Sequence, residues 1–264
     1  MSAIHDDVRV PATPLTLTGE RTAPGIWHEQ YWFARHLAAY RYVAAEIVAT
    51  RAALATDVAT ITLEAGCGEG YGLDELAAGG SRVVGLDYDA VTVRHAAATY
   101  GRDVLRGNVV RLPLADASVD AAVSLQVIEH IWTPHELVAD LRRVLRPGGL
   151  LAVSTPNRLT FSPGLGRGER PTNAFHVREY DDEELARLVG AGFGPVQRLG
   201  VQRGPRLRAL DARFASFPAA QLATPPERWP DDLADAVRAV RAEDFEIGPA
   251  DDDALDLLVI AGQR

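Results

Sequence analysis

A glycine-rich stretch between an expected strand and an expected helix constrains the fold of this chain more than any other feature. The β-prone residues 59–63 lead into Glu64, and a helical pattern follows over residues 73–78. Between them, glycine recurs at every second position: Gly66, Gly68, Gly70 and Gly72. Glycine has no Cβ atom and tolerates positive φ, so the backbone of such a loop can approach a ligand closely. Because α/β sheets hold nucleotide-like ligands at strand-to-helix turns, the stretch predicts a cofactor site.

The residues around the glycines decide between kinds of nucleotide site. A P-loop needs Gly-Lys-Ser/Thr, which is missing here, and the chain contains no lysine at all. A second expected strand, 82–86, ends at Asp87, which lies 21 positions after Gly66 (87 − 66). That spacing suits a carboxylate that accepts hydrogen bonds from ribose hydroxyls, in NAD or in S-adenosylmethionine. An oxidoreductase with a Tyr-x-x-x-Lys pair is disfavoured because lysine is absent, and a binding scaffold without catalysis remains an alternative.

The order of the expected elements predicts an α/β fold of one elaborated domain. Strand and helix patterns alternate through the middle of the chain, which indicates a doubly wound parallel sheet with helices on both faces. The chain divides into an N-terminal arm and helix (1–57), a core (58–201), a helical insertion (202–254) and a final strand (255–264). We expect the arm, the first helix and the insertion to cover the strand ends and to bind substrate.

Composition narrows the class of protein. The 264 residues carry a formal net charge of −9, which argues against a nucleic-acid partner because phosphate binding needs a positive surface. A local basic patch could still form and would be weak evidence for such a partner; it would contain Arg203, Arg206, Arg208 and Arg213. The single cysteine, the polar N-terminus and the lack of a long apolar run predict a cytoplasmic protein without a signal peptide or a membrane span.

Two later segments extend the pattern beyond the glycine loop. They are Gly107–Pro113, which follows a third expected strand, and Leu145–Thr155, which reads as a helix end, a Pro/Gly turn and a buried strand. With these segments in this order, the chain resembles the class I S-adenosylmethionine-dependent methyltransferases over roughly residues 58–200 and a final strand at 255–261. The resemblance implies a Rossmann-like, seven-stranded, mostly parallel sheet and S-adenosylmethionine as the cofactor.

Carried over by position, the resemblance assigns ten residues to the cofactor site. Asp87 would hold the ribose, Tyr88, Asn108 and Val109 would meet the adenine, and Gln126 would lie near the methionine moiety. Asn108 could instead be a turn residue, and Glu64 could either fix the loop or meet the cofactor's ammonium through water. Cys67 is expected to pack in the loop rather than to act as a nucleophile. The full cofactor set is Glu64, Gly66, Cys67, Gly68, Gly70, Asp87, Tyr88, Asn108, Val109 and Gln126.

The run from Gln126 to His130 follows the fourth expected strand, 119–125, and carries the candidate catalytic pair. Imidazoles titrate near neutral pH, so His130 could take the proton of an acceptor hydroxyl, oriented by Glu129, although it could also be structural. Methyltransferases of the ubiquinone-biosynthesis type place a metal at Glu-x-x-Glu-His. Here Gln126, a poorer ligand for a hard cation, stands at the first position, so the metal remains unknown and Mg²⁺ stays open.

Three residues are candidates for acceptor binding. His176 follows a Gly/Pro-rich loop after the fifth strand, where side chains line the crevice at the strand ends, or it is a turn residue. Tyr31 and Trp32 lie on the first expected helix, 29–54; aromatic residues at this spacing are usually core, but Trp32 could stack on a sugar face.

A closer resemblance reaches the arm and the insertion as well as the core. The chain resembles the mycobacterial sugar 1-O-methyltransferases of methylmannose polysaccharide biosynthesis in Leu15–Thr22, Tyr31–His36, Gln126–Trp132, Ser154–Gly164, Gly204–Arg208 and Leu255–Leu258. This resemblance implies O-methylation of the anomeric hydroxyl of a short 3-O-methylated mannoside, an oligosaccharide substrate, with His130 as the base. A quinone, polyketide or lipid precursor is the alternative acceptor, and a homodimer stays open.

Overall fold

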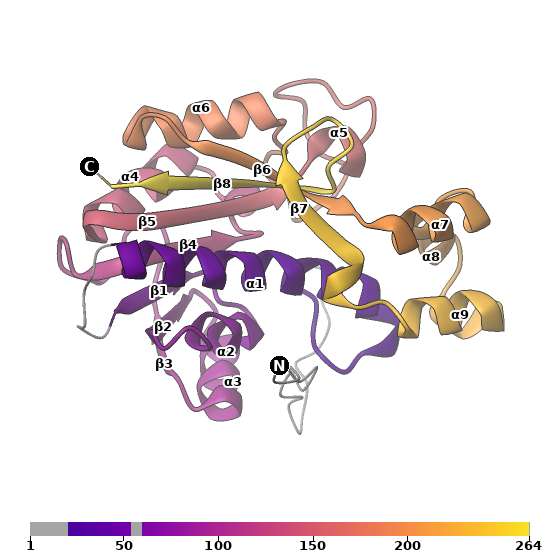
Figure 1. The fold of residues 1–264 in the computed structure, drawn as a ribbon, viewed down its shortest axis with the longest axis horizontal. Coiled ribbons are helices and arrows are strands. Elements are labelled where there is room, and N and C mark those ends of the chain that lie inside the picture. Colours follow the sequence, from indigo (N-terminus) through magenta and orange to yellow (C-terminus); the bar gives the residue numbers. More distant parts are fainter. Residues whose placement is uncertain (1–20, 54–59, 264) are drawn as a thin grey trace.

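An eight-stranded mixed sheet forms the centre of the computed structural model, which describes residues 21–53 and 60–263 (Figure 1). The strand order is β3-β2-β1-β4-β5-β8-β6-β7. Neighbours from β3 to β5 are parallel, β8 is antiparallel to β5 and β6, and β7 is antiparallel to β6. The strands are β1 Ile61–Ala65, β2 Arg82–Asp87, β3 Asp103–Arg106, β4 Val119–Leu125, β5 Leu145–Pro156, β6 Gln197–Arg203, β7 Phe245–Pro249 and β8 Asp256–Gly262.

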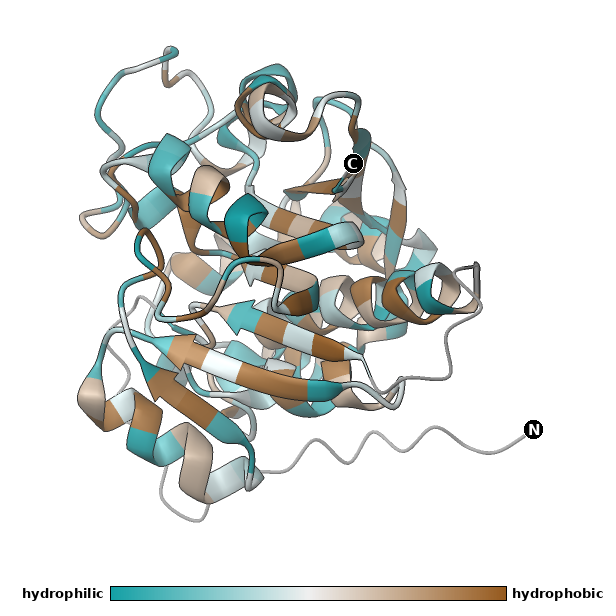
Figure 2. Cartoon of the chain, turned by 90° about the vertical axis from the view of Figure 1, so that its left-hand side faces the viewer, coloured by the Kyte–Doolittle hydropathy of each residue, from teal (hydrophilic) through white to brown (hydrophobic). Residues whose placement is uncertain are grey.

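Helices cover both faces of the sheet, as the alternating pattern predicts. One apolar cluster joins α1, α2 and the segments after β6 to the sheet, and a second cluster joins α4 and α6 to the opposite face. The hydrophobic colour of the central strands in Figure 2 lies between these layers. The helices are α1 Gln30–Ala53, α2 Tyr71–Ala77, α3 Ala90–Tyr100, α4 Pro134–Val144, α5 Arg158–Phe161, α6 Asp182–Phe193, α7 Pro205–Phe214, α8 Phe217–Leu222 and α9 Asp231–Arg238, with short 3₁₀ turns at Trp27–Glu29, Ile128–His130, Pro226–Arg228 and Ala242–Asp244.

The long helix α1 crosses one face of the sheet, and its sequence explains why. Tyr31, Ala34, Tyr40 and Val43 recur at helical spacing and are buried on one side, while the opposite side is partly exposed. Arg35, on the same helix, forms a buried ion pair with Asp256 at the start of β8, with 3.0 Å between Nε and Oδ2. Helix α1 is therefore tied to the sheet by apolar packing and by one buried charge pair.

The sheet has one more strand than the seven predicted. Residues 245–249 lie in the segment expected to be a helical insertion, yet they form β7, an edge strand paired with β6 from Arg203↔Phe245 to Leu199↔Pro249. The short Phe-Glu-Ile alternation of β7 gives a weak sequence signal, and its pairing partner is distant in the chain. The helices of the predicted insertion are α7, α8 and α9. The first 20 residues of the predicted N-terminal arm lie outside the described residues.

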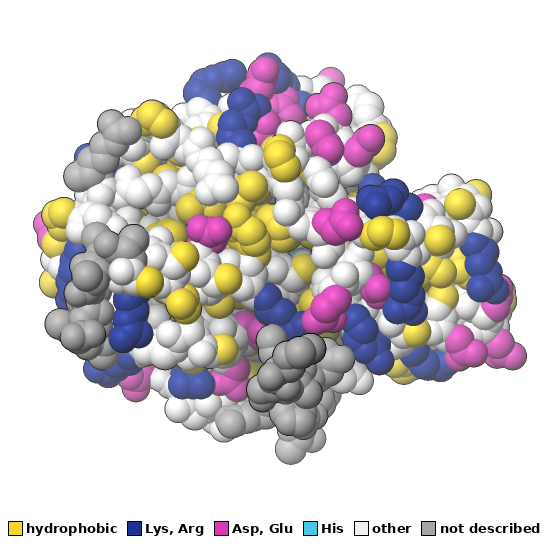
Figure 3. All heavy atoms as spheres, in the orientation of Figure 1, with side chains coloured by type: hydrophobic (Ala, Val, Ile, Leu, Met, Phe, Trp, Pro, Cys, Tyr) yellow, Lys and Arg dark blue, Asp and Glu magenta, His cyan; other side chains and the backbone are white. Residues whose placement is uncertain are grey.

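The four arginines that suggested a basic patch are each paired with an acid. The ion pairs are Arg203–Asp211 at 2.7 Å, Arg206–Asp244 at 3.1 Å, Arg208–Glu246 at 3.6 Å and Arg213–Asp232 at 2.6 Å. Figure 3 accordingly shows acidic and basic side chains interleaved over α7–α9 on this face. Among the described helices, none is long and apolar enough to cross a membrane.

Candidate functional site

The glycine loop between β1 and α2 has the backbone that its sequence predicts. Gly66, Gly68 and Gly70 have φ values of +87°, +49° and +92°. A Cβ atom at Gly66 would lie 2.5 Å from Val127 Cγ2, and one at Gly70 would lie 2.7 Å from Ala96 Cβ. Only glycine satisfies both the positive φ and these close approaches. The loop is therefore a fixed cradle at the carboxyl end of β1.

Asp87, the last residue of β2, holds this loop in place. Its Oδ2 accepts a hydrogen bond from the Gly68 N–H at 3.0 Å, and its Oδ1 accepts one from the Asp89 N–H at 2.9 Å. Each carboxylate oxygen can accept a second hydrogen bond. Asp87 also lines the cavity described next.

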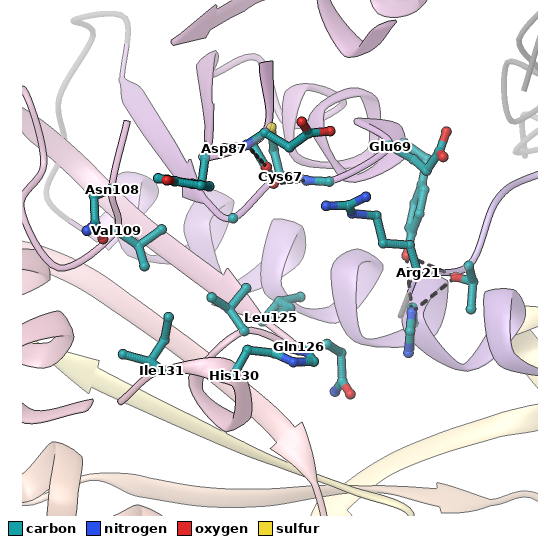
Figure 4. A pocket seen from close by; sticks show the side chains of 18 of the residues that line it. Arg21, Cys67, Glu69, Asp87, Asn108, Val109, Leu125, Gln126, His130 and Ile131 are labelled. Carbon is teal, nitrogen blue, oxygen red and sulfur yellow. Dashed lines mark hydrogen bonds between the residues drawn. The ribbon is translucent and has the colours of Figure 1, made fainter. Parts of the chain in front are cut away.

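A cavity of about 720 Å³ opens above the carboxyl ends of β1, β2 and β4 (Figure 4). It lies in the size range of small-molecule sites in proteins. The predicted cofactor residues that line it are Gly66, Cys67, Gly68, Asp87, Tyr88, Asn108, Val109 and Gln126. Burial raises the pKa of the Cys67 thiol well above its ordinary value, so this side chain is a neutral packing group. Asn108 also makes the turn predicted as its alternative role, because its Oδ1 accepts from the Val110 N–H at 3.1 Å.

Glu64 lies beneath the loop rather than in the cavity wall. Its Oε1 accepts a hydrogen bond from the Tyr40 hydroxyl at 2.5 Å, and both side chains are buried. Burial raises the pKa of Glu64 to about 8. Of the two predicted roles, its position favours fixing the loop, since a Cβ atom at Gly72 would meet Glu64 and Tyr40 at about 2.5 Å.

Gln126 follows β4 in a backbone conformation that non-glycine residues rarely adopt. Its φ is +57°, and its Nε2 donates to the Ser154 hydroxyl at 3.2 Å. Its backbone N–H also donates to the Ser154 carbonyl oxygen, at 3.1 Å. Such conformations persist where the surroundings hold them, and they cluster at functional sites. These two hydrogen bonds to Ser154 hold Gln126 against β5, where it lines the cavity.

His130 reaches the cavity from the 3₁₀ turn after β4, and its ring is oriented by its surroundings. Its Nδ1 lies 2.9 Å from the carbonyl oxygen of Phe175, which can only accept, so Nδ1 carries the proton. The other nitrogen, Nε2, therefore carries the lone pair, and it lies 3.9 Å from Glu129 Oε1. The arrangement makes His130 a proton acceptor on the cavity wall.

Behind His130 lies a buried polar group that includes Glu129 and His176. Glu129 Oε2 accepts from the Thr155 hydroxyl at 3.1 Å, and burial raises the pKa of this carboxyl. His176 Nδ1 lies 2.9 Å from Glu179 Oε1, and its ring meets the His130 ring at a centroid distance of 5.1 Å. Ligand atoms of Glu129, His130 and His176 all lie within 4.8 Å of one another. The fold thus brings together three predicted site residues from two segments.

The two aromatic residues predicted on α1 lie elsewhere. Tyr31 is 1% exposed and packs against Trp32, Phe217 and Phe245, so it belongs to the core and does not line the cavity. Trp32 lines a separate open groove with Trp229. His176 does not line the main cavity either, and reaches it through its contact with His130.

Several cavity residues escaped the sequence predictions, and five of them come from the segment before α1, from α1 or from α2. They are Arg21, Thr22, His36, Tyr40 and Tyr71. Figure 4 shows Arg21 on the side of the cavity away from Asn108. His36 Nδ1 lies 3.1 Å from the Tyr71 hydroxyl, and burial, with a smaller contribution from Arg35, lowers the pKa of His36 to about 3. The only signal for Arg21 and His36 was that both fall within segments of the closer resemblance.

Known proteins similar to this chain are described as methyltransferases. A methyltransferase-domain family matches residues 63–153. A protein named "Probable S-adenosylmethionine-dependent methyltransferase" from Mycolicibacterium smegmatis is 48% identical over 256 residues, which cover 94% of this chain and 95% of the relative. A protein of the same description from Mycobacterium tuberculosis (strain H37Rv) is 47% identical over 257 residues, covering 94% and 89%.

Solved structures share the fold at low sequence identity. A SAM-dependent methyltransferase of Thermotoga maritima, described as a possible histamine N-methyltransferase, has a TM-score of 0.56 at 16% identity and covers 90% of this chain and 95% of its own. A geranyl diphosphate methyltransferase has a TM-score of 0.52 at 16% identity, with 85% of each chain covered. At these identities the likeness concerns the fold alone.

Proposed function

The chain belongs to the class I S-adenosylmethionine-dependent methyltransferases, and we propose that it is an O-methyltransferase in which His130 is the general base. The single observation that carries the proposal is the tautomer of His130, a residue of the cavity wall, because its Nδ1 hydrogen bond to the Phe175 carbonyl leaves Nε2 as the proton acceptor. A hydroxyl acceptor has a proton to lose, and a positioned imidazole can take it.

The cavity fits the donor by shape and by hydrogen-bonding groups. Gly66 and Gly68 of the loop line the cavity, and Asp87 retains acceptor positions for two ribose hydroxyls. We propose that Tyr88, Asn108 and Val109 contact the adenine and that Gln126 contacts the methionine portion. When bound, the donor supplies a methyl group on a positively charged sulfur, which is a good leaving group.

The chain's own groups then have defined tasks in the transfer. The acceptor oxygen forms a bond to the methyl carbon as the carbon–sulfur bond breaks, and its proton passes to His130 Nε2. The Phe175 carbonyl holds the ring, and Glu129 stabilises the imidazolium that forms. We propose that the site holds the two reacting atoms in line, because positioning is the main source of rate in a displacement of this kind.

For the acceptor, we propose the anomeric hydroxyl of a short 3-O-methylated mannoside. Support comes from the resemblance in the arm and insertion and from the aromatic surface beside His130: Trp132 is 84% exposed, and Phe161 stacks on His176 at 5.2 Å. Aromatic planes suit the C–H faces of sugars. The alternative is another small molecule, such as a quinone, polyketide or lipid precursor. We also propose a homodimer and a cytoplasmic location. The native mass of the protein tests the first, and cell fractionation tests the second.

The side chains of the candidate cluster suit proton transfer better than they suit the binding of Mg²⁺. Glu129, His130 and His176 offer two imidazoles and one carboxylate, whereas Mg²⁺ prefers oxygen ligands and keeps several waters. Both imidazoles donate Nδ1 to an oxygen, which leaves Nε2 available to a proton or to a softer ion such as Zn²⁺. We therefore propose that methyl transfer does not require Mg²⁺.

The test is a single substitution that removes the base but keeps the hydrogen bond to Phe175. We expect His130→Asn to lower kcat by roughly 10²–10⁴-fold while the affinity for S-adenosylhomocysteine stays within about twofold. His135→Gln, on the exposed surface of α4, is the matched control and should not change either quantity. Labelled methyl uptake is measured on a panel of free and 3-O-methylated mannosides and on quinone and polyketide precursors. Unchanged turnover in His130→Asn contradicts the base role, and uptake by a non-sugar acceptor alone contradicts the mannoside.

A further inference from the structure

The end of the cavity opposite Asn108 and Val109 is closed by a side chain from the segment before α1. Arg21 lines the cavity, and Figure 4 shows its guanidinium extending toward the glycine loop, between Glu69 and Cys67. A Cβ atom at Gly68 would lie 3.9 Å from Arg21 Cδ, so the stem of Arg21 passes over this glycine. Arg21 thus stands where a ligand lying along the loop would end.

The charges around this end are mostly negative. Glu69, Asp87 and Asp89 line the cavity, and the chain has no lysine. Burial raises the pKa of Glu69, while the neighbouring His95 and then Arg21 oppose this rise. His36 is neutral because burial lowers its pKa to about 3. Among the described lining residues, Arg21 is the one side chain that is always positively charged.

The donor's own chemistry matches this distribution of charge. With ribose at Asp87 and adenine at Asn108, the amino-acid end of the donor extends past Gly68 toward Arg21. The sulfonium and ammonium groups suit acidic walls, but the methionine carboxylate would be repelled by them. A guanidinium binds a carboxylate through two parallel N–H···O bonds, so it supplies both the charge and the geometry.

We propose that Arg21 binds the carboxylate of the donor's methionine end, an inference that rests on the proposed placement of the donor. Arg21 then distinguishes S-adenosylmethionine from nucleosides that lack an amino-acid tail. It also joins the segment before α1 to the cofactor, because the same residue lies over Gly68 and beside Thr22, which lines the cavity with it.

The proposal is tested by comparing two ligands that differ in the carboxylate. S-adenosylhomocysteine carries the amino-acid tail, and 5′-methylthioadenosine lacks it. By titration calorimetry, Arg21→Met should weaken S-adenosylhomocysteine by about 10- to 100-fold and leave 5′-methylthioadenosine within about twofold. Arg21→Lys keeps the charge but loses the paired hydrogen bonds, so its loss should be intermediate. Arg94→Met, an exposed site on α3 that removes the same charge, should change neither affinity.

Each other outcome overturns a different statement. Equal losses for both ligands in Arg21→Met would mean that Arg21 supports the cavity without contacting the carboxylate. Full affinity of Arg21→Met for both ligands would place the carboxylate elsewhere. If the unsubstituted protein binds neither ligand, the proposed donor site itself is wrong. That failure is seen without any Arg21 variant, so it is distinguishable from a failure of the Arg21 proposal.

Discussion

The buried carboxyl of Glu64 predicts an unusual dependence of stability on pH. Burial raises its pKa from 4.5 to about 8, partly opposed by the hydrogen bond from Tyr40. The proton on Glu64 is therefore bound more tightly in the folded state than in the unfolded state. This contribution to stability is fully present below pH 4.5 and is lost as the pH rises through about 8. Each pH unit inside this window costs about 1.36 kcal/mol.

His36 has the opposite effect at lower pH. Its pKa falls from 6.5 to about 3 on folding, so its contribution is present above pH 6.5 and is lost as the pH falls toward 3. Between pH 4.5 and 6.5 the two slopes oppose each other, and the free energy of unfolding should be nearly flat. From pH 6.5 to 8 His36 no longer contributes to the slope, so Glu64 alone should account for a loss of about 2 kcal/mol, over 1.5 units at about 1.36 kcal/mol each.

The perturbation that isolates this effect is Glu64→Gln. Glutamine has the shape of a protonated glutamate and can still accept from the Tyr40 hydroxyl, so it imitates the neutral form at every pH. Free energies of unfolding from urea titrations at half-unit steps between pH 4.5 and 8.5 should fall above pH 6.5 for the unsubstituted protein and stay level for the variant. Parallel curves for the two proteins over pH 6.5–8 would refute the reasoning.

Three further predictions concern the loop, the ribose contact and the metal. Gly66→Ala should lower the free energy of unfolding by about 2–4 kcal/mol, because it adds a clash with Val127 to a positive φ. The control Gly101→Ala has a φ of +61° and open space around its Cβ, so it should cost only about 1–2 kcal/mol. Equal losses of the two variants in urea titrations would contradict the close packing of the glycine loop. Asp87→Ala should weaken the binding of S-adenosylhomocysteine by roughly 10- to 100-fold in calorimetry. Asp89→Ala loses the N-cap of α3 and about 1 kcal/mol of stability, but it should weaken this binding far less. Similar affinities of the two variants would count against the ribose contact. Dialysis against EDTA should leave methyl transfer unchanged, and activity restored by Mg²⁺ after its loss would contradict the base-only site.

The features that the sequence predicts best are those set by local chemistry. The alternate glycines require positive φ and close backbone contacts, and both are present at Gly66 and Gly70. Asp87 could be placed from its spacing because a strand-end carboxylate lies beside the neighbouring strand's loop in any parallel sheet. The fourth strand matches its predicted bounds of 119–125, and five of its seven residues are apolar.

The features that the sequence does not reveal depend on contacts between distant segments. Tyr31 and Trp32 are adjacent aromatics on a helix where such residues are usually core, and the sequence does not say which of the two is buried. The packing of Phe217 and Phe245 against Tyr31 decides this. The Nδ1 proton of His130 is fixed by Phe175, 45 positions away, and Arg21 meets the loop across a similar separation. No periodicity or spacing encodes these pairings, so they required the fold.

A crystal structure of the complex with S-adenosylhomocysteine would test the proposed donor site and the proposed base at once. We expect its ribose hydroxyls on the Asp87 carboxylate and its sulfur turned toward the side of the cavity that carries His130 Nε2. A ligand bound outside this cavity, or one whose sulfur points away from His130, would contradict the proposed site and its base together.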